Sequence, residues 1–138
     1  MAGSTAEVIR DMSRAGVLSF DIIALMMEGT DGSIKMKNFG EFWPFYVRVH
    51  SHPFNRKLHF TGTGLVIVCF LWGVATLNPL CFALMPVFGY GFAWIGHFTV
   101  EKNTPAAFQY PVWSLIADFK MFGLILTGKM DEEIKRIG

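Results

Sequence analysis

The sequence predicts an all-α membrane protein, in which a transmembrane helical hairpin is flanked by interfacial or amphipathic helices. Hydrophobic residues make up 52% of the 138 residues, and the mean hydropathy of +0.39 is too high for an ordinary soluble domain. Residues 60–77 and 80–100 carry no formal charge, and each segment is long enough to cross a bilayer. Asn78 and Pro79 lie between the two segments and indicate a tight turn.

The charge pattern argues against a nucleic-acid-binding protein, and the cysteines argue against a protein held together by disulfides. The net charge is +1, and the basic residues are scattered, which argues against nucleic acid as a partner. Cys69 and Cys81 lie inside the apolar segments, so we expect no disulfide. Glu7, Arg10 and Asp11 precede any apolar run, so the N-terminus does not have the pattern of a secretory signal and is expected to stay in the mature chain.

Residues 1–38 are expected to form an N-terminal helix and a linker. Ser4 and Glu7 have the spacing of a capping box, and apolar residues follow at near-helical intervals to about residue 27. The apolar part of this helix is too short to span a membrane, so an interfacial or packing role is predicted. Residues 28–33 are rich in turn-forming residues.

Residues 39–127 are expected to form the membrane domain, and residues 128–138 a polar C-terminal tail. Residues 39–49 are aromatic, and Trp43 and Tyr46 are typical of the headgroup level of a membrane, so this segment is predicted to be interfacial. Residues 111–126 predict an amphipathic or re-entrant helix that packs on the hairpin or covers its site. The predicted apolar stripe of this helix consists of Val112, Leu115, Phe119, Phe122 and Leu126, with Ser114, Asp118 and Met121 elsewhere.

Three of the four histidines lie within ten residues, directly before the first apolar segment. On one unbroken helix His50 and His59 would point in opposite directions. Pro53 is expected to end one helix and begin the next, so that these two side chains can face each other across a bend. Neutral imidazole is a common ligand for iron and zinc, and imidazoles with carboxylates suit iron sites that use oxygen. We therefore interpret the group, including His52, as a metal site.

The fourth histidine, His97, is predicted to return to the same place. From the turn at residues 78–79, His59 lies about nineteen residues back and His97 about eighteen forward, which is roughly 27–29 Å along each helix. Glu101 follows His97 by one helical turn on the same face. It is predicted to be a metal ligand or to orient an imidazole, and the alternative is a solvated helix end.

The basic residues predict an orientation in the membrane. Arg48, Arg56, Lys57 and Lys102 flank the histidine-bearing ends of the hairpin, whereas the turn has no lysine or arginine. By the positive-inside rule, both termini and the histidine site are expected to face the cytoplasm. Arg56 and Lys57 are candidates to bind a substrate carboxylate, or else they contact lipid headgroups.

Short motifs surround the histidines on both sides of the turn. They are Phe45-Tyr46 before His50, His52-Pro53, Asn55-Arg56, Leu58-His59-Phe60 and Gly62, then Gly89-Tyr90-Gly91, Gly96-His97, Glu101-Lys102, Pro105-Ala106, Trp113-Ser114-Leu115 and Asp118-Phe119. Together they resemble the family of the yeast 2-hydroxy-palmitic acid dioxygenase over about residues 39–127. The resemblance implies an integral membrane protein that uses Fe(II) and O2 to remove one carbon from a 2-hydroxy fatty acid during phytosphingosine breakdown.

The resemblance also assigns residues and a location. His50, His59 and His97 match the iron-associated histidines and are the expected catalytic residues, whereas many relatives have asparagine at the position of His52. The chain differs from the yeast form through residue 38 and is similar to short bacterial-type members. The implied location is the endoplasmic reticulum in a eukaryote or the inner membrane in a bacterium. Two alternatives stay open: a haem-binding electron-transfer protein that uses His59 and His97, and a non-catalytic hairpin that scaffolds membrane.

Overall fold

The structure is a computed structural model that describes residues 35–138. The predicted helix up to about residue 27 and the linker at residues 28–33 lie outside the described residues. Residues 37–138 form one compact unit, and it contains every feature discussed below.

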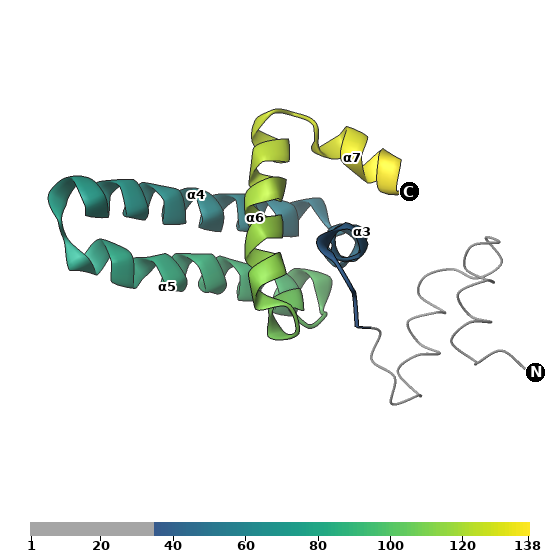
Figure 1. Ribbon diagram of the computed structural model, residues 1–138, viewed down its shortest axis with the longest axis horizontal. Helices are drawn as coiled ribbons and strands as arrows, with labels where there is room; N and C mark the ends of the chain where they lie inside the picture. The colour runs from purple at the N-terminus through teal and green to yellow at the C-terminus, as the bar shows by residue number, and fades with distance from the viewer. Residues whose placement is uncertain (1–34) are drawn as a thin grey trace, which may run out of the picture. The chain divides into compact units, whose positions relative to one another are not determined.

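This unit is built from helices alone, and residues 35–138 contain no strand. Helices α4 and α5 run antiparallel as a long hairpin, and α6 crosses the hairpin near its open end (Figure 1). The predicted all-α class and the hairpin are thus confirmed. In chain order the elements are α3 (Phe39–Val49), α4 (Pro53–Thr76), α5 (Pro79–Ile95), a π-helical segment (Gly96–Glu101), a 3-10 turn (Ala106–Phe108), α6 (Pro111–Leu126) and α7 (Met130–Ile137).

Each arm of the hairpin begins at a proline that follows a capping side chain. The Phe54 N–H donates to His52 Nδ1 at 3.1 Å at the start of α4, and the Leu80 N–H donates to Asn78 Oδ1 at 3.0 Å at the start of α5. Proline is suited to the first helical position because its missing N–H would have no partner there. These local signals fix where the bend before α4 and the turn before α5 occur.

Glycines allow the two arms to pack closely. A Cβ built at Gly62 would lie 3.0 Å from Phe92 Cβ, and one built at Gly73 would lie 3.0 Å from Cys81 Cβ. Close approach through small residues is typical of helices that associate in a membrane. Close packing of the two helices therefore accounts for these glycines, and no role in chemistry needs to be assigned to them.

Both arms are candidate membrane spans. Pro53–Thr76 has a mean hydropathy of 1.8 and Pro79–Glu101 one of 1.4. Only 22% and 11% of the two apolar windows are buried within the protein, so neither arm has the surroundings of a core helix in a soluble domain. By length and composition, both helices fit a bilayer as their surroundings.

Helix α6 has the predicted bounds, but most of its predicted apolar stripe is exposed, and Phe119 of that stripe lines a cavity. Val112, Leu115 and Leu126 are exposed, whereas Ser114 and Met121 are buried. An amphipathic helix in water places its apolar side inward, but this rule does not hold where hydrocarbon replaces water outside the protein. The polar side of α6 is consequently available to the interior.

The polar tail contains a helix, α7, that contacts α3. Trp43 Nε1 donates to Glu133 Oε1 at 2.6 Å, and Arg136 forms an ion pair with the same carboxylate. These hydrogen bonds lower the pKa of Glu133 to about 2, with the bond from Arg136 as the largest cause. Lys120 of α6 lies 4.0 Å from the Trp43 ring centroid, which joins α3, α6 and α7 around one aromatic side chain.

Candidate metal centre and cavity

Three histidines meet where α3, α4 and the π-helical segment come together. The ring centroids lie 4.3 Å apart for His50 and His59, 4.5 Å for His50 and His97, and 5.2 Å for His59 and His97. One ligand atom from each ring lies within 4.8 Å of the other two. The three residues are 0%, 5% and 2% exposed, respectively. The structure therefore brings together the residues expected from the bend at Pro53 and from equal depth on the two arms.

The Nδ1 atom of each imidazole ring lies within hydrogen-bond distance of an oxygen atom. His50 Nδ1 lies 2.6 Å from the Tyr46 carbonyl oxygen, His59 Nδ1 lies 2.7 Å from Asp118 Oδ1, and His97 Nδ1 lies 2.7 Å from Asn103 Oδ1. Carbonyl, carboxylate and amide oxygens only accept hydrogen bonds, so we assign the hydrogen of each neutral imidazole to Nδ1. This leaves the lone pair on Nε2, the tautomer that a metal-binding histidine needs.

No hydrogen-bond donor lies between the Nε2 lone pairs of His50 and His59. His50 Nε2 and His59 Nε2 are 3.2 Å apart, and with both hydrogens on Nδ1 neither nitrogen can donate to the other. Buried acceptors that face one another without a donor are costly, and a cation among them removes this cost. The donor set thus fits a metal ion that prefers imidazole.

Burial keeps His50 neutral. Removal from water lowers the pKa of His50 well below its ordinary value of 6.5, and the neighbouring His59 and His97 lower it further. Burial also raises the pKa of Tyr46 well above 10.0, with the Asp118 charge as the second cause. At neutral pH, His50 therefore keeps its Nε2 lone pair, and Tyr46 keeps its phenolic hydrogen.

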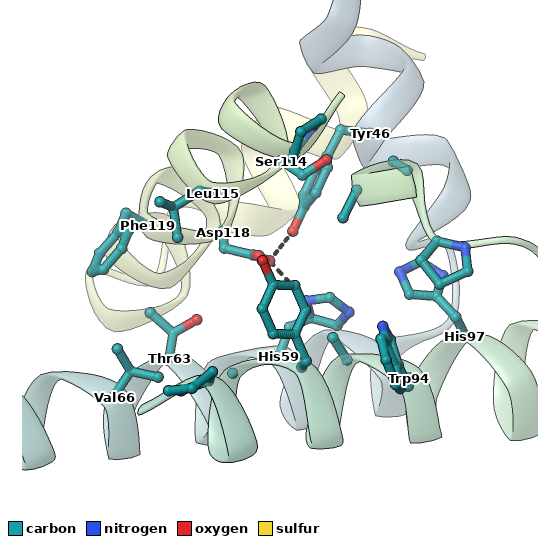
Figure 2. A pocket seen from close by; sticks show the side chains of 18 of the residues that line it. Tyr46, His59, Thr63, Val66, Trp94, His97, Ser114, Leu115, Asp118 and Phe119 are labelled. Carbon is teal, nitrogen blue, oxygen red and sulfur yellow. Dashed lines mark hydrogen bonds and ion pairs between the residues drawn. The ribbon is translucent and has the colours of Figure 1, made fainter. Parts of the chain in front are cut away.

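Asp118 of α6 orients His59 and is itself held in place. Its Oδ1 atom accepts hydrogen bonds from both His59 Nδ1 and the Tyr46 hydroxyl (Figure 2). The sequence predicted no site role for Asp118 or Asn103, and for Tyr46 only a position at the headgroup level, whereas Tyr46 is 1% exposed and packed inside the protein. Asp118 and Tyr46 occur in the family motifs, which was the available signal. Asn103 had no such signal, because it lies outside those motifs.

A π-helical segment positions His97. Gly96–Glu101 holds one more residue per hydrogen-bonded turn than an α-helix, and such segments often occur at functional sites. Asn103 Nδ2 donates to the Val49 carbonyl oxygen at 2.9 Å and so ties this segment to the end of α3. A Cβ at Gly96 would lie 1.8 Å from Asn55 Oδ1, so any larger residue would displace the Asn55 side chain.

Glu101 and His52 lie outside the histidine cluster. Glu101 Oε1 accepts from the His52 N–H at 2.7 Å and from Asn55 Nδ2 at 3.3 Å, while Oε2 accepts from Ser51 Oγ at 3.1 Å. A carboxylate at this position stabilises the N-terminus of α4, where backbone N–H groups lack partners within the helix. The Glu101 carboxylate is therefore occupied by hydrogen bonds at the bend between α3 and α4. Metal ligation by Glu101 or His52 stays a prediction.

The two candidate carboxylate-binding residues also lie elsewhere. Arg56 Nη1 donates to the carbonyl oxygens of His50 and Ser51 at 2.8 and 2.6 Å, which stabilises the bend between α3 and α4. Lys57 borders a separate hollow with Met130 and Asp131. Neither Arg56 nor Lys57 lines the cavity beside the histidines.

That cavity has a polar end and an apolar body. It has a volume of about 280 Å³ and lies among α4, α5 and α6 (Figure 2). Val66 is seven residues beyond His59 on α4, so the lining extends about 10 Å along the hairpin from the cluster. The polar end is lined by His50, His59, His97, Tyr46, Ser114 and Asp118, and the apolar body by Val66, Met85, Pro86, Ala93, Trp94 and Phe119.

A family model matches most of this unit. Residues 36–130, which include the hairpin, α6 and all four histidines, match the family described as 2-hydroxy-palmitic acid dioxygenase Mpo1-like. The chain belongs to this family. The resemblance inferred from the motifs is thereby confirmed, and the family's name implies a dioxygenase of fatty acid metabolism. Neither the curated proteins nor the solved structures contain a significant match.

Proposed function

We propose that this chain is an integral membrane, Fe(II)-dependent dioxygenase that shortens a 2-hydroxy fatty acid by one carbon. One observation carries the proposal: three buried imidazoles with inward lone pairs stand at the head of an apolar cavity. A metal ion at this position would contact the polar end of a molecule whose long apolar part lies in the cavity. This description fits a fatty acid and excludes a sugar or a nucleotide.

His50, His59 and His97 would hold the iron. Three neutral imidazoles suit Fe(II) and leave further coordination positions for other ligands. When bound, Fe(II) supplies the redox chemistry with O2 that none of the side chains lining the cavity offers. The chain in turn fixes each imidazole through Tyr46, Asp118 and Asn103.

The proposed reaction balances without an organic reductant. The C1–C2 bond of the 2-hydroxy acid breaks, C1 leaves as carbon dioxide, and C2 becomes the new carboxyl carbon. O2 accepts the electrons from both carbons and supplies two oxygen atoms, and the remaining hydrogens leave as water. The cavity contributes by holding the reacting head beside the histidines and by keeping bulk water away from it.

We further propose that the histidine end of the hairpin faces the cytoplasm. Arg48, Arg56, Lys57 and Lys102 lie at that end, and the opposite turn has no basic residue. The site would then lie at headgroup level, and the cavity would extend toward the membrane interior. The membrane would be the endoplasmic reticulum in a eukaryote or the inner membrane in a bacterium.

The two alternatives have less support. A haem held by His59 and His97 must have its macrocycle between them, but their ring centroids are only 5.2 Å apart and the His50 ring lies within 4.5 Å of both, so the three rings leave no room for a macrocycle there. A membrane scaffold would have no need for three buried imidazoles with unpaired Nε2 atoms. No observation in the described residues favours either alternative over a metal centre.

The test uses full-length protein that is purified in detergent without a histidine tag and stripped of metal. The protein is loaded with Fe(II) without oxygen, and O2 is then admitted together with 2-hydroxy-palmitate or palmitate. We expect mass spectrometry to detect the acid shortened by one carbon only from the hydroxylated substrate. Zn(II)-loaded protein, which cannot carry out redox chemistry, is the control. Equal conversion of both acids, or of neither, would contradict the proposal.

A further inference from the structure

One buried polar atom at the cavity lacks a partner. Ser114 is 3% exposed, its Oγ atom has no hydrogen-bond partner, and its side chain lines the cavity. The other such atom in the described residues, Asn55 Oδ1, packs against Gly96 and does not line the cavity. An unpaired buried hydroxyl is costly, so a group that enters the cavity and pairs with it gains binding energy.

The hydroxyl of Ser114 is not required by the fold. The Ser114 backbone N–H already donates to the Tyr110 carbonyl oxygen at 2.9 Å, which forms part of the first turn of α6. Alanine is a better helix former than serine, so helix α6 does not explain the choice of serine at this position. Contact with a ligand therefore explains the serine hydroxyl better than the stability of α6 does.

Ser114 lies beside the residues that orient the metal ligands. Asp118 follows it by one helical turn, about 6 Å along α6, and on the same face. Both side chains line the cavity on the side where Tyr46 and His59 lie (Figure 2). A molecule whose head occupies the histidine end of the cavity thus lies beside Ser114. The Ser114 Oγ atom is enclosed in the structure and turns toward such a molecule by rotation about the Cα–Cβ bond.

We propose that Ser114 binds the 2-hydroxyl group of the substrate and selects hydroxylated over unsubstituted fatty acids. This inference rests on the proposed function and extends it to the recognition of the hydroxyl group. A serine hydroxyl both donates and accepts, as does the substrate hydroxyl, so the two groups match in chemistry. The substrate carboxylate matches less well, because Asp118 is close by and no lysine or arginine is among the described residues that line the cavity.

The expected effect is the loss of one neutral hydrogen bond. Ser114→Ala should weaken the binding of a 2-hydroxy fatty acid by about tenfold and leave the binding of the unsubstituted acid unchanged. Since the Ser114 hydroxyl has no partner in the protein, the variant should unfold at the same temperature as the wild type or slightly higher. A structural role for this hydroxyl would lower the unfolding temperature.

The experiment measures binding to metal-free, full-length protein in lipid nanodiscs, because bound metal would itself contact the substrate oxygens. Displacement of a fluorescent fatty acid gives affinities for 2-hydroxy-palmitate and palmitate. The variants are Ser114→Ala, Ser114→Thr, which keeps a hydroxyl, and the control Thr61→Val, which removes an exposed hydroxyl bonded to its own helix. We expect a preference for the hydroxylated acid in the wild type, in Thr61→Val and partly in Ser114→Thr, and none in Ser114→Ala.

Two results would overturn the inference. One is a preference that survives in Ser114→Ala, and the other is a wild type without any preference. Turnover by iron-loaded wild-type protein is measured in parallel and judges the proposed function separately. If the wild type shortens only the hydroxylated acid while Ser114→Ala keeps the binding preference, the role of Ser114 fails and the dioxygenase function stands.

Discussion

At the turn end of the hairpin Leu77 is 84% exposed, whereas at the open end His50 is fully buried. Both ends belong to the same pair of apolar helices, but only the open end is covered by α3 and α6 (Figure 1). Toward the turn end large apolar side chains are exposed, whereas the buried residues of the hairpin itself are polar or glycine: Asn55, His59, Gly62, Thr63, Gly73, Gly96 and His97. The usual pattern of a soluble protein, apolar inside and polar outside, is reversed along one hairpin.

The difference has a physical reason. A helix surrounded by hydrocarbon needs only an apolar surface and internally satisfied backbone groups, so the turn end requires no further packing. Imidazoles and carboxylates in the same surroundings must be enclosed and paired. Helices α3 and α6 supply this enclosure through Tyr46 and Asp118, so the site can exist only at the covered end.

The largest effect is expected from removing a histidine of the cluster. His59→Ala deletes one of three ligands of the proposed iron site and should abolish both iron content and turnover while the protein stays in the membrane. His50→Ala and His97→Ala should behave in the same way. Iron is measured by mass spectrometry of purified, untagged protein.

His52→Asn is the matched control for these variants. His52 is only two residues from His50, but it is exposed and lies outside the cluster, and its Nδ1 atom accepts a hydrogen bond at the start of α4. Asparagine can accept the same bond, so iron content and turnover should stay near wild type. Loss of iron in His52→Asn, or wild-type iron in all three alanine variants, would contradict the assignment of the cluster.

A smaller effect is expected from the acceptor that orients His59. Asp118→Asn keeps the shape of the side chain but removes its charge, and an amide can present its N–H group to the imidazole instead of an acceptor. Iron affinity should fall by about 10- to 100-fold, the range for residues that orient a metal ligand. The measurement is competition with a chelator. Asp131→Asn on α7 removes a carboxylate far along the chain from the cluster and should leave the affinity unchanged, and an equal loss in both variants would contradict a specific role for Asp118.

A smaller effect again is expected inside the apolar body of the cavity. Gly89 lines the cavity, and a Cβ at this position would lie 3.4 Å from Val66. Gly89→Leu should fill part of the cavity and shift the preferred substrate toward shorter acyl chains, which a series of 2-hydroxy acids would measure. Gly91 is two residues further along the same helix, and its Cβ would meet nothing within 4 Å. Gly91→Leu is therefore the matched control, and an identical shift in both variants would contradict this position for the acyl chain.

The sequence predicted the features that depend on distance along the chain. Helix rise alone places His59 and His97 at one depth, and the geometry of Pro53 alone requires a bend after His50. The partners of Glu101, Arg56 and Asp118 were not predictable in this way, because each depends on how separate helices pack. For Asp118 the apolar stripe of α6 was also misleading, since most of that stripe is exposed, whereas Asp118, which lies outside the stripe, points to the histidines.

The smallest effect is expected at the turn end. Leu77 ends α4 in the left-handed conformation, with φ of 54°, which is unfavourable for a residue with a Cβ and is common for glycine. Leu77→Gly should therefore stabilise the turn by about 1 kcal/mol, partly offset because glycine presents no apolar side chain to the lipid. Unfolding in mixed detergent micelles measures the change. If the two ends of the hairpin are as independent as their surroundings indicate, iron affinity and turnover should equal those of the wild type. A change in iron affinity would show instead that strain at the turn is transmitted along both helices to the histidines.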